Sequence, residues 1–569
     1  MVACLFYVVY NIHNKNVYSI EKTGGYTVRE IRLKARAKIN LTLDGTGKRE
    51  DGYHLLETIM QTVALYDGIY MKKLEKPVIK LKTNLPWLPT DARNLAWKAA
   101  NLMRETFGIK EGVFSMATFL IGLVILFVGA AIYGKFCEKV FGPDDRETPA
   151  YSKQDGVDYV PMRGWKNSLI NLLNIAGTGP IIGPIQGILF GPIAFITIPI
   201  GNVIGGAMHD YFSGMICLRD GGTQMPDMVR KYSNKGVFTV YQIFLSVLLL
   251  LVGAVFIYTP GDIAATQVFG FDGAATSVST WVIYGVIFVY YLIATVFPID
   301  AIIGRIYPIF GAILLLSAVG VFIGMFVKGY PLLNLWDNWQ SATFNYGEYF
   351  TAQHFIPVFF ITVACGILSG FHSTQTAIIS RTMKSEKQGR MTFYNMMILE
   401  GFIAMIWAAA AMGVYNLGLQ EVNASLATGT VGIICRDLLG PVGGIIALLG
   451  VIVLPITSGD TALRSLRLSI SDSLHIDQSS KPKRLGLSAI IFALVAVILV
   501  FAKSSPDGFN LLWRYFAWSN QTLSLFAFLG ISVWMFENSK AKWVWIPLIP
   551  GAWYTFVTVT FIANAQIGF

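Results

Sequence analysis

Apolar residues form long runs from residue 117 onward, and the chain before that point has no run of comparable length. Up to about residue 112 the chain is charged and carries short alternating runs typical of strands, such as Ile39 to Leu43. A membrane-spanning helix needs about 20 apolar residues, and the first such run extends from Ala117 to Phe136. The pattern predicts a small α/β fragment over residues 1–115 and an all-α polytopic membrane domain over residues 116–569.

The apolar runs of the second part predict about twelve transmembrane helices. We expect them at residues 117–136, 168–190, 192–216, 237–258, 277–297, 301–328, 354–380, 395–418, 440–463, 485–502, 510–536 and 542–564. The stretch from Asn423 to Leu439 is long enough to add a half-helix before the ninth span.

Basic residues fall in alternate loops of this predicted topology. Clusters of Lys and Arg follow the first, third, seventh, ninth and eleventh spans, whereas residues 259–279, 330–353 and 417–431 contain neither. Loops rich in Lys and Arg stay on the cytoplasmic side, so we expect a multi-pass protein of the cytoplasmic membrane. The segment before the first span would then lie outside, although it has no signal peptide. We therefore expect the functional membrane protein to begin at Met116, after a gene-fusion or start-site extension.

The composition restricts the class of protein further. Of the 569 residues, 54% are hydrophobic and 14% are charged, and the mean hydropathy is +0.55, which indicates an integral protein of the lipid bilayer. The net charge of +10 resides mainly in short loops, so it argues against nucleic acid as a partner. The five cysteines show no CxxC spacing, so we expect neither a metal site nor a disulfide framework, and no resident cofactor.

Two apolar spans are interrupted by small and helix-breaking residues. NIAGTGPIIGP runs from Asn174 to Pro184, and CGILSGFHSTQ runs from Cys365 to Gln375. Irregular backbone within a membrane is tolerated where it borders protein or a polar cavity, and matched breaks in two halves mark the substrate site of inverted-repeat transporters. If the span near 168 is the first of a repeat, the span near 354 is the sixth and crosses in the opposite direction. The alternative is that Gly and Pro here only permit close helix packing or a kink.

The polar groups around both breaks are the candidate substrate site. Freed N–H groups at a half-helix N-terminus favour a carboxylate, and freed carbonyl groups favour a cation. His372 could donate to a carboxylate or carry a proton, or it could be an interfacial histidine. The candidate substrate-binding residues are Asn174, Ala176, Gly177, Thr178, Gly179, Gln186, Gly366, Ser369, Gly370, His372, Ser373 and Gln375.

A second oxygen-rich stretch follows Pro455, which loosens its helix. Hydroxyl and carboxylate oxygens beside exposed carbonyl groups suit a hard cation. The candidates for coupling a sodium ion or a proton are Ala176, Thr457, Ser458, Asp460 and Thr461. Asp460 could instead pair with Arg464, which lies four residues on along the same helix face.

Other ionisable residues lie near the ends of spans and suggest gating contacts. We expect His209, Asp210, Asp300 and Arg464 to act in gating, with the acidic groups paired to loop arginines rather than to substrate. Glu400 lies in the apolar part of its span and has no assigned role.

The first part resembles a known enzyme. The runs KARAKINLTLDGTGKREDGYHLLETIMQTVALYD (Lys34 to Asp67) and RNLAWKAANLM (Arg93 to Met103) resemble 4-diphosphocytidyl-2-C-methylerythritol kinase, a GHMP-type kinase. The resemblance implies that Lys38, Asn40, Tyr53 and His54 correspond to its substrate site. The Gly- and Ser-rich phosphate loop and the later catalytic Asp are absent, so this fragment is expected to be truncated, vestigial and without enzymatic activity.

The membrane domain also resembles a known family. Its motifs are FGPDDRETPAYSKQDGVDYVPM (Phe141 to Met162), NIAGTGPIIGPIQG, HDYFSGMICLRDGG (His209 to Gly222), FPIDAIIGRIYPIFG, ITVACGILSGFHSTQ and ITSGDTALRSLR (Ile456 to Arg467). Together they resemble the carbon starvation protein A (CstA) family over residues 116–569. The resemblance implies uptake of peptides or, in some members, of pyruvate, and a core of five-plus-five inverted repeats. In the wider superfamily a sodium ion, or a basic side chain replacing it, sits between the first and eighth helices of that core.

The expected function is therefore secondary-active import. We expect a transporter of small peptides or pyruvate-like carboxylates that works by alternating access, coupled to a proton or sodium gradient. The alternatives are a membrane-tethered isoprenoid-pathway kinase, which the missing phosphate loop disfavours, and a passive channel. No GxxxxGK[ST] motif is present, which argues against ATP-driven transport by this chain itself. The substrate, the coupling ion and the oligomeric state stay open at this point.

Overall fold

A computed structural model shows the arrangement of these parts. It describes residues 30–48, 54–72, 116–155, 159–296, 300–337, 346, 355–420, 427–474, 476, 481–505 and 508–564. The chain divides into two compact units, Met1–Ser115 and Met116–Phe569, and each is described by itself.

The first unit contains a two-stranded antiparallel sheet. Strand β1 (Glu30–Lys48) pairs with β2 (His54–Lys72), from Glu30 opposite Lys72 to Lys48 opposite His54, with three irregularities in the register. The predicted strand at residues 39–43 lies inside β1. Of the kinase-like positions, Lys38 and Asn40 lie in β1, His54 begins β2, and Tyr53 lies outside the described residues.

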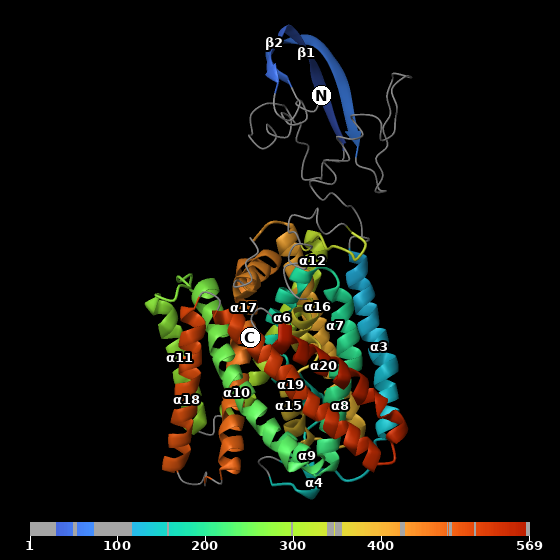
Figure 1. Ribbon diagram of the computed structural model, residues 1–569, viewed down its shortest axis with the longest axis vertical. Helices are drawn as coiled ribbons and strands as arrows, with labels where there is room; N and C mark the ends of the chain where they lie inside the picture. Colours follow the sequence, from blue (N-terminus) through green and yellow to red (C-terminus); the bar gives the residue numbers. More distant parts are fainter. Residues whose placement is uncertain are drawn as a thin grey trace. The chain divides into compact units, whose positions relative to one another are not determined.

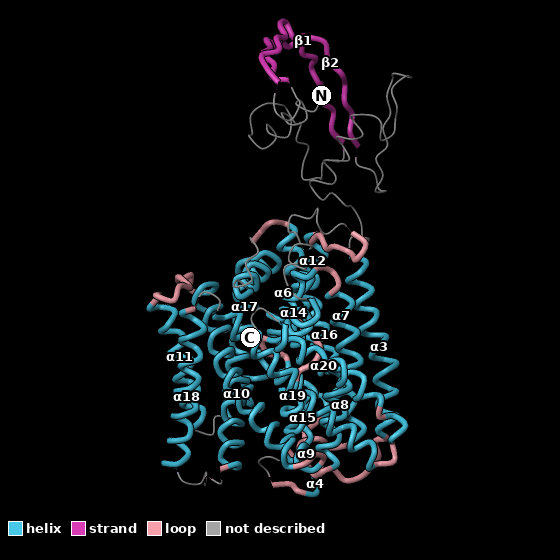
Figure 2. Tube along the Cα trace, viewed as in Figure 1, coloured by secondary structure: helices cyan, strands magenta, loops and turns pink. Residues whose placement is uncertain are grey.

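The second unit is helical (Figures 1 and 2). Its α-helices are α3 (Ala117–Phe141), α4 (Pro149–Ser152), α5 (Gly164–Ile175), α6 (Gly179–Gly187), α7 (Ala194–Gly201), α8 (Ala207–Arg219), α9 (Met225–Lys231), α10 (Lys235–Ile263), α11 (Val278–Val296), α12 (Asp300–Lys328), α14 (Phe355–Thr362), α15 (Gly370–Ser380), α16 (Asn395–Asn416), α17 (Ala427–Ser473), α18 (Lys481–Ser504), α19 (Gly508–Glu537) and α20 (Trp545–Asn564). Short 3-10 and π-helical turns extend several of them, including η2 (Ile188–Phe190), η3 (Asn202–Gly206), η4 (Ala264–Val268), η6 (Ala364–Gly366), η7 (Glu386–Gln388), η8 (Arg390–Tyr394) and η10 (Ala541–Trp543).

Helices occupy all twelve predicted ranges, but not all are continuous apolar cylinders. In the described residues, seven helices are long and apolar enough to cross a membrane, and the bent pair α5–α6 would add an eighth. The other predicted spans are α7–α8, α14–α15, α11 and α19, which are interrupted, shorter or more polar. Hydropathy underestimates such helices because their polar groups face protein rather than lipid.

The ninth predicted span begins where expected and ends later. Helix α17 (Ala427–Ser473) consists of two helices joined at a kink: the first lies within the predicted half-helix at residues 423–439, and the second begins at the predicted boundary and ends at Ser473, beyond the predicted end at residue 463. A kink separates the two parts at Gly440, whose φ of 72° is a left-handed conformation that favours glycine. Pro441 then begins the second part, where a missing N–H is tolerated.

The helix contacts repeat with an offset of five spans, which confirms the predicted five-plus-five core. The spans of the core are counted here from the broken span α5–α6, which is the first. Helix α6 of the first span packs on α16 of the seventh, and α15 of the sixth packs on α8 of the second. Likewise α10 of the third span packs on α19 of the tenth, and α17 of the eighth packs on α12 of the fifth. Within each of these two pairs of contacts, replacing every span by the one five positions away converts one contact into the other. Helices α3 and α20 are additional to the ten.

The two halves are inverted relative to each other. At the start of α5, the Asn167 amide donates to the Thr382 carbonyl oxygen at 2.9 Å, and the Thr382 hydroxyl donates to Asn167 Oδ1 at 2.8 Å. Thr382 lies just beyond the end of α15. The first broken helix therefore begins where the second one ends, so the two cross in opposite directions.

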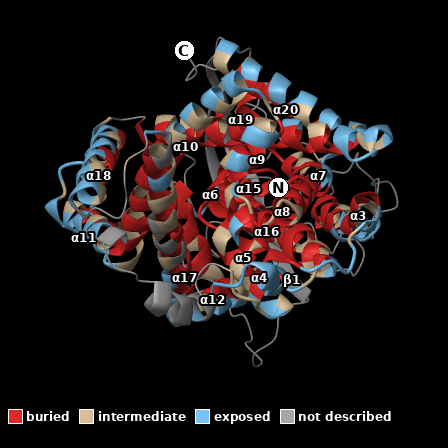
Figure 3. Cartoon of the chain, turned by 90° about the horizontal axis from the view of Figure 1, so that it is seen from below, coloured by how far each residue is buried: buried red, intermediate tan, exposed pale blue. Residues whose placement is uncertain are grey.

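Burial separates a central core from a lipid-facing rim. Helices α6, α15 and α16 lie centrally and are mostly buried, whereas α3, α11, α18 and α20 lie at the periphery (Figure 3). Large apolar side chains such as Val124, Val286, Val497 and Val559 are exposed on these outer helices. Exposed apolar side chains in such numbers suit a lipid environment, where they carry no penalty.

The loops after α3, α8 and α15 meet on one face of the unit. Lys153 Nζ donates to the Gly221 carbonyl oxygen at 2.8 Å, and Arg381 Nε donates to that of Gly222 at 2.8 Å. On the same face, a hydrogen bond from the Arg146 guanidinium holds the pKa of the exposed Asp144 carboxyl below its usual range. Three of the predicted basic clusters thus share one side, as the charge pattern requires.

A buried ion pair joins these loops. The Glu386 side chain has no exposed surface and accepts two hydrogen bonds from Arg219, from Nε and from Nη2, both at 2.9 Å. Arg219 also donates to the Gly142 carbonyl oxygen at 2.7 Å and lies over the Phe141 ring. The pair therefore ties the loop after α3 to the end of α8 and to η7.

Replacing Glu386 with glutamine is expected to lower the free energy of unfolding by about 3 kcal/mol, because it leaves the Arg219 guanidinium without its counter-charge. Thermal unfolding of the purified protein measures this. The adjacent variant Lys387→Gln is the control, since Lys387 pairs with Asp145 at an exposed site and should matter by less than about 1 kcal/mol. Equal shifts for the two variants would contradict this role of the buried pair.

Candidate functional site

The first helix break separates α5 from α6. Helix α5 ends at Ile175, α6 begins at Gly179, and the two are bent by 50°. Ala176 leaves the helical conformation, with φ −79° and ψ 60°. A Cβ atom on Gly177 would lie 3.3 Å from the Phe256 ring, a tight contact that a small shift of the ring would relieve. The Gly- and Pro-rich sequence thus produces the break that it predicts.

The second break separates α14 from α15. After the 3-10 turn η6, Ser369 is extended, and α15 begins at Gly370. Asn520 of α19 fastens this segment: its Oδ1 accepts from the Phe371 N–H at 2.8 Å, and its Nδ2 donates to Ser369 Oγ at 2.9 Å. A Cβ atom on Gly370 would collide with the Asn520 carbonyl oxygen and lie 2.6 Å from the Ser524 nitrogen. Glycine is therefore required where α15 crosses α19.

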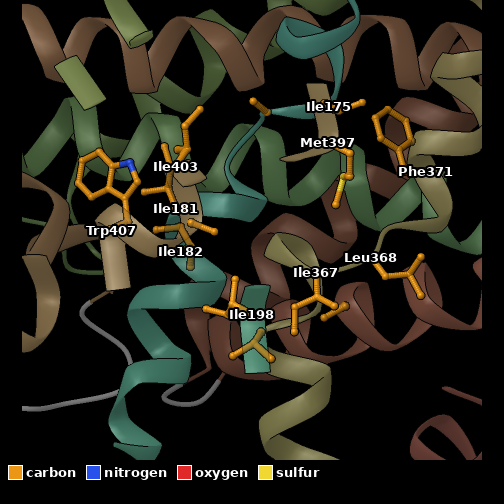
Figure 4. Packing of buried hydrophobic residues seen from close by; sticks show 14 of the residues in the cluster. Ile175, Ile181, Ile182, Ile198, Ile367, Leu368, Phe371, Met397, Ile403 and Trp407 are labelled. Carbon is orange, nitrogen blue, oxygen red and sulfur yellow. The ribbon is translucent and has the colours of Figure 1, made fainter. Parts of the chain in front are cut away.

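The two breaks lie against each other and border a cavity. Helix α6 packs on η6, and α5 packs on α15. Figure 4 shows apolar side chains from both breaks, such as Ile175, Ile181 and Ile367, packed together with Met397 and Trp407 of α16. The cavity has a volume of about 20 Å³ and is lined by Asn174, Ile175, Gly177, Gly179, Pro180, Val252, Phe256, Ser369, Phe371, His372, Glu400, Phe516 and Asn520. This volume has room for about one water molecule, so the side chains around it must move to admit a larger ligand.

Four ionisable side chains from three helices form a buried cluster at this cavity. They are His209 and Asp210 of α8, His372 of α15 and Glu400 of α16, and none is more than 3% exposed. Asp210 Oδ1 lies 2.9 Å from His209 Nδ1, and Asp210 Oδ2 lies 3.2 Å from His372 Nδ1. His372 Nε2 lies 3.6 Å from Glu400 Oε2.

His372 is the central member of this cluster. Its ring stands between two carboxylates and also interacts with the backbone of Ile175, the last residue of α5. Buried charges are costly unless they are paired, and ionisable groups inside membranes usually mark substrate or ion pathways. A histidine between two carboxylates can bind and release a proton, and its charge then changes its attraction to both carboxylates. The arrangement can therefore link the protonation state of α15 to the contacts of α8 and α16.

The predicted substrate-binding residues fall into two groups. Five of them line the cavity: Asn174, Gly177, Gly179, Ser369 and His372. The others do not line it, although most are buried nearby: Ala176, Thr178, Gln186, Gly366, Gly370, Ser373 and Gln375. Their contacts are partly structural. The Gly366 carbonyl accepts from Asn202, and the Ser373 hydroxyl donates to the Gly370 carbonyl.

The predicted cation site stays a prediction. The side chains of Thr457 and Asp460 lie outside the described residues, so neither a cation site nor the alternative pair with Arg464 can be assigned to Asp460. Ser458 is buried, and its hydroxyl has no hydrogen-bond partner in the described part of the chain. Arg464 Nη2 lies 3.4 Å from the Ala294 carbonyl oxygen.

The expected contacts of the gating residues need correction. Asp210 was expected to pair with a loop arginine near the cytoplasmic end of its span, but its carboxylate is fully buried and binds His209 and His372 instead. The reason is that α8 packs on α15, which brings His372 to Asp210. Among the described residues, the loop arginine Arg219 pairs with Glu386. The side chain of Asp300 is not described.

Two polar residues that line the cavity had no role assigned from the sequence. Glu400 carried a signal, because a carboxylate within an apolar span is a functional candidate by default. Asn520 carried none, since its role depends on contacts with a segment about 150 residues away in the chain. Both join a site that otherwise consists of the two breaks.

Comparison with known proteins identifies the family. A protein-family model described as "Carbon starvation protein CstA" matches residues 114–270, 257–436 and 415–561 of the chain. The chain belongs to the CstA family. An uncharacterized membrane protein of Haemophilus influenzae is 39% identical over 344 residues, which cover 53% of this CstA chain and 92% of that relative. The CstA chain is thus a multi-pass membrane transporter, in keeping with its helices.

The first unit of the CstA chain is similar to a different set of proteins. The 4-diphosphocytidyl-2-C-methyl-D-erythritol kinase of Clostridium botulinum is 56% identical over 84 residues, and that of Caldicellulosiruptor saccharolyticus is 57% identical over 81 residues. These matches cover 30% and 28% of the two kinases. The chain therefore spans less than a third of the kinases that it matches.

Distant likenesses to solved structures include transporters. MhsT in complex with L-phenylalanine gives a TM-score of 0.49 at 13% identity, covering 69% of this CstA chain and 98% of that one. A manganese transporter of Eremococcus coleocola gives 0.46 at 10% identity, covering 70% and 86%. These likenesses are too distant to inform the substrate, which the chain's own residues must indicate.

Proposed function

We propose that this protein is a secondary-active importer of small peptides or pyruvate-like carboxylates, driven by a proton gradient. The observation that carries the proposal is the buried cluster of His209, Asp210, His372 and Glu400 beside a cavity at two helix breaks. His372 both lines the cavity and belongs to the proton-binding cluster, so substrate binding and proton binding would affect each other through this side chain.

The helix breaks favour a substrate with a carboxylate. Helices α6 and α15 both begin at the cavity, with Gly179 at the first position of α6 and Phe371 at the second position of α15. Within these first turns Pro180 has no N–H, and the Phe371 N–H already donates to Asn520 Oδ1. The donors that the two starts can offer are therefore the N–H groups of Gly179 and Gly370, to which the helix dipole adds partial positive charge. Peptides and pyruvate both present a carboxylate to such a terminus.

The cluster favours a proton over sodium as the coupling ion. Sodium prefers a shell of oxygen ligands, whereas a histidine flanked by two carboxylates suits proton binding. Protonated His372 would hold α8 and α16 together through Asp210 and Glu400. Loss of the proton would weaken both contacts and permit the helices to separate, which supplies the differential interaction that alternating access needs.

Uptake into proteoliposomes tests this function. With the pH lower outside, labelled dipeptide or pyruvate is expected to accumulate above its external concentration, and the accumulation should collapse when a protonophore is added. A sodium gradient without a pH gradient is the matched control. Accumulation that requires sodium would refute proton coupling, and equilibration without accumulation under either gradient would indicate a passive channel instead.

We further infer that the first unit is not a kinase. It matches less than a third of its kinase relatives, and it lacks the phosphate loop that such kinases need. Incubation of the purified protein with ATP and a diphosphocytidyl alcohol should yield no phosphorylated product.

A further inference from the structure

Glu400 is the cavity residue with the least satisfied charge. Its side chain is fully buried, and neither of its carboxylate oxygens has a hydrogen-bond partner among the described residues. Its closest charged neighbour is His372 Nε2 at 3.6 Å, beyond ordinary hydrogen-bond distance. Because buried polar groups in proteins are nearly always hydrogen-bonded, an unsatisfied carboxylate at a cavity indicates that a ligand completes the site.

The neighbouring residues do not neutralise this carboxylate. His372 is shared with Asp210, so one imidazolium would face two carboxylates. His209 contacts Asp210 through Nδ1, and its buried Nε2 has no hydrogen-bond partner in the described part of the chain. Among the described residues that line the cavity, none is Lys or Arg. The cluster beside the cavity therefore carries one negative charge in excess when Asp210 and Glu400 are ionised and His372 alone is protonated.

The other walls of the cavity can bind the rest of a small zwitterion. The starts of α6 and α15 favour a carboxylate, as argued above. Phe256, Phe371 and Phe516 provide apolar surface between the polar groups, and an aromatic face also attracts an ammonium group. A molecule with an amine at one end and a carboxylate at the other thus finds complementary charge at both ends.

We propose that Glu400 binds the protonated amino group of the substrate, so that the transporter selects amine-bearing carboxylates and discriminates against carboxylates without an amine. This inference rests on the proposed transport function and narrows its substrate class. An amine on Glu400 would replace the weak contact with His372 and thereby change the charge around the proton-binding group. Pyruvate would leave the Glu400 carboxylate without a counter-charge inside the closed cavity.

Equilibrium binding to the purified full-length protein tests the inference without depending on transport. Isothermal titration in nanodiscs would compare two matched pairs: L-alanine with pyruvate, and L-alanyl-L-alanine with its N-acetyl derivative. Each pair differs at the amine. We expect the amine-bearing member to bind at least ~30-fold more tightly, since breaking a buried charge pair costs 2 kcal/mol or more.

The variant Glu400→Gln keeps the shape of the side chain and removes its charge. It should lose the preference for the amine in both pairs, and the affinity for pyruvate should stay the same or rise, because pyruvate no longer faces an uncompensated carboxylate. Equal binding within each pair in the wild-type protein, or a preference that survives in Glu400→Gln, would overturn the inference. The wild-type comparison needs no variant and so holds even if Glu400→Gln fails to fold. A preserved preference for the amine without gradient-driven uptake would refute the transport proposal alone.

Discussion

Replacing His372 with glutamine is expected to abolish proton-driven accumulation of substrate, by at least ~100-fold, because no other member of the cluster lies between Asp210 and Glu400. Glutamine preserves hydrogen bonding and approximate size but cannot carry a proton near neutral pH. Exchange of labelled for unlabelled substrate across the membrane needs no net proton movement, and it should fall less than about tenfold. Parallel measurements of accumulation and exchange in proteoliposomes separate lost coupling from lost binding.

The control for His372→Gln is Ile378→Ala on the same helix. Ile378 is 37% exposed and lies outside the cavity, so its truncation should leave both measurements near those of the wild type. Gel filtration of each variant shows whether it remains folded, since in His372→Gln both Asp210 and Glu400 lose the histidine that lies between them. Accumulation by His372→Gln at the wild-type level would show that the coupling proton binds elsewhere.

Adding a methyl group at Gly370 is expected to prevent stable folding, whereas a larger addition at Gly177 should block transport in a folded protein. The methyl group of Gly370→Ala would meet the backbone of α19 at Asn520 and Ser524, which cannot move aside without displacing the helix. Overpacking of this kind costs about 1–3 kcal/mol or more. Gly177 faces the ring of Phe256, which can shift, so Gly177→Val fills the cavity with less strain.

The yield of monodisperse protein and its thermal midpoint measure the first effect, and uptake measures the second. Gly285 is a matched control, because a Cβ atom there meets no atom within 4 Å, and Gly285→Ala should leave folding and uptake unchanged. A stable, active Gly370→Ala variant would contradict the close crossing of α15 and α19. Normal uptake by Gly177→Val would show that substrate does not pass this cavity.

Much of the fold follows from local patterns. The ranges of α3, α11, α12 and α18 agree with the predicted spans within a few residues, because lipid requires a run of apolar residues of fixed length. Both helix breaks were predicted for a similar reason, because Gly and Pro alter the backbone conformation and hydrogen bonding at their own positions. The break inside α17 was predicted in the same way, because Gly440 and Pro441 stand where the half-helix ends and the ninth span begins, whereas the end of that span at Ser473 was placed too early.

The candidate site was predicted in part. Asn174, Gly177, Gly179, Ser369 and His372 were found because they lie in the breaks themselves. Asp210 was assigned to the wrong kind of contact, and Glu400 and Asn520 to none, because each acts through a residue that is more than 25 positions away in the chain.

Apolar length, charge asymmetry and helix-breaking residues were sufficient to predict a multi-pass membrane protein with helices in twelve ranges, two opposed broken helices and basic loops that share one face. These properties depend on the solvent and on short stretches of backbone, so they can be read along the chain. Which side chains meet at the breaks was settled by the packing of α8, α15, α16 and α19 around them. The charge balance of the cavity depends on distances between residues on different helices, and those distances exist only once the helices are packed.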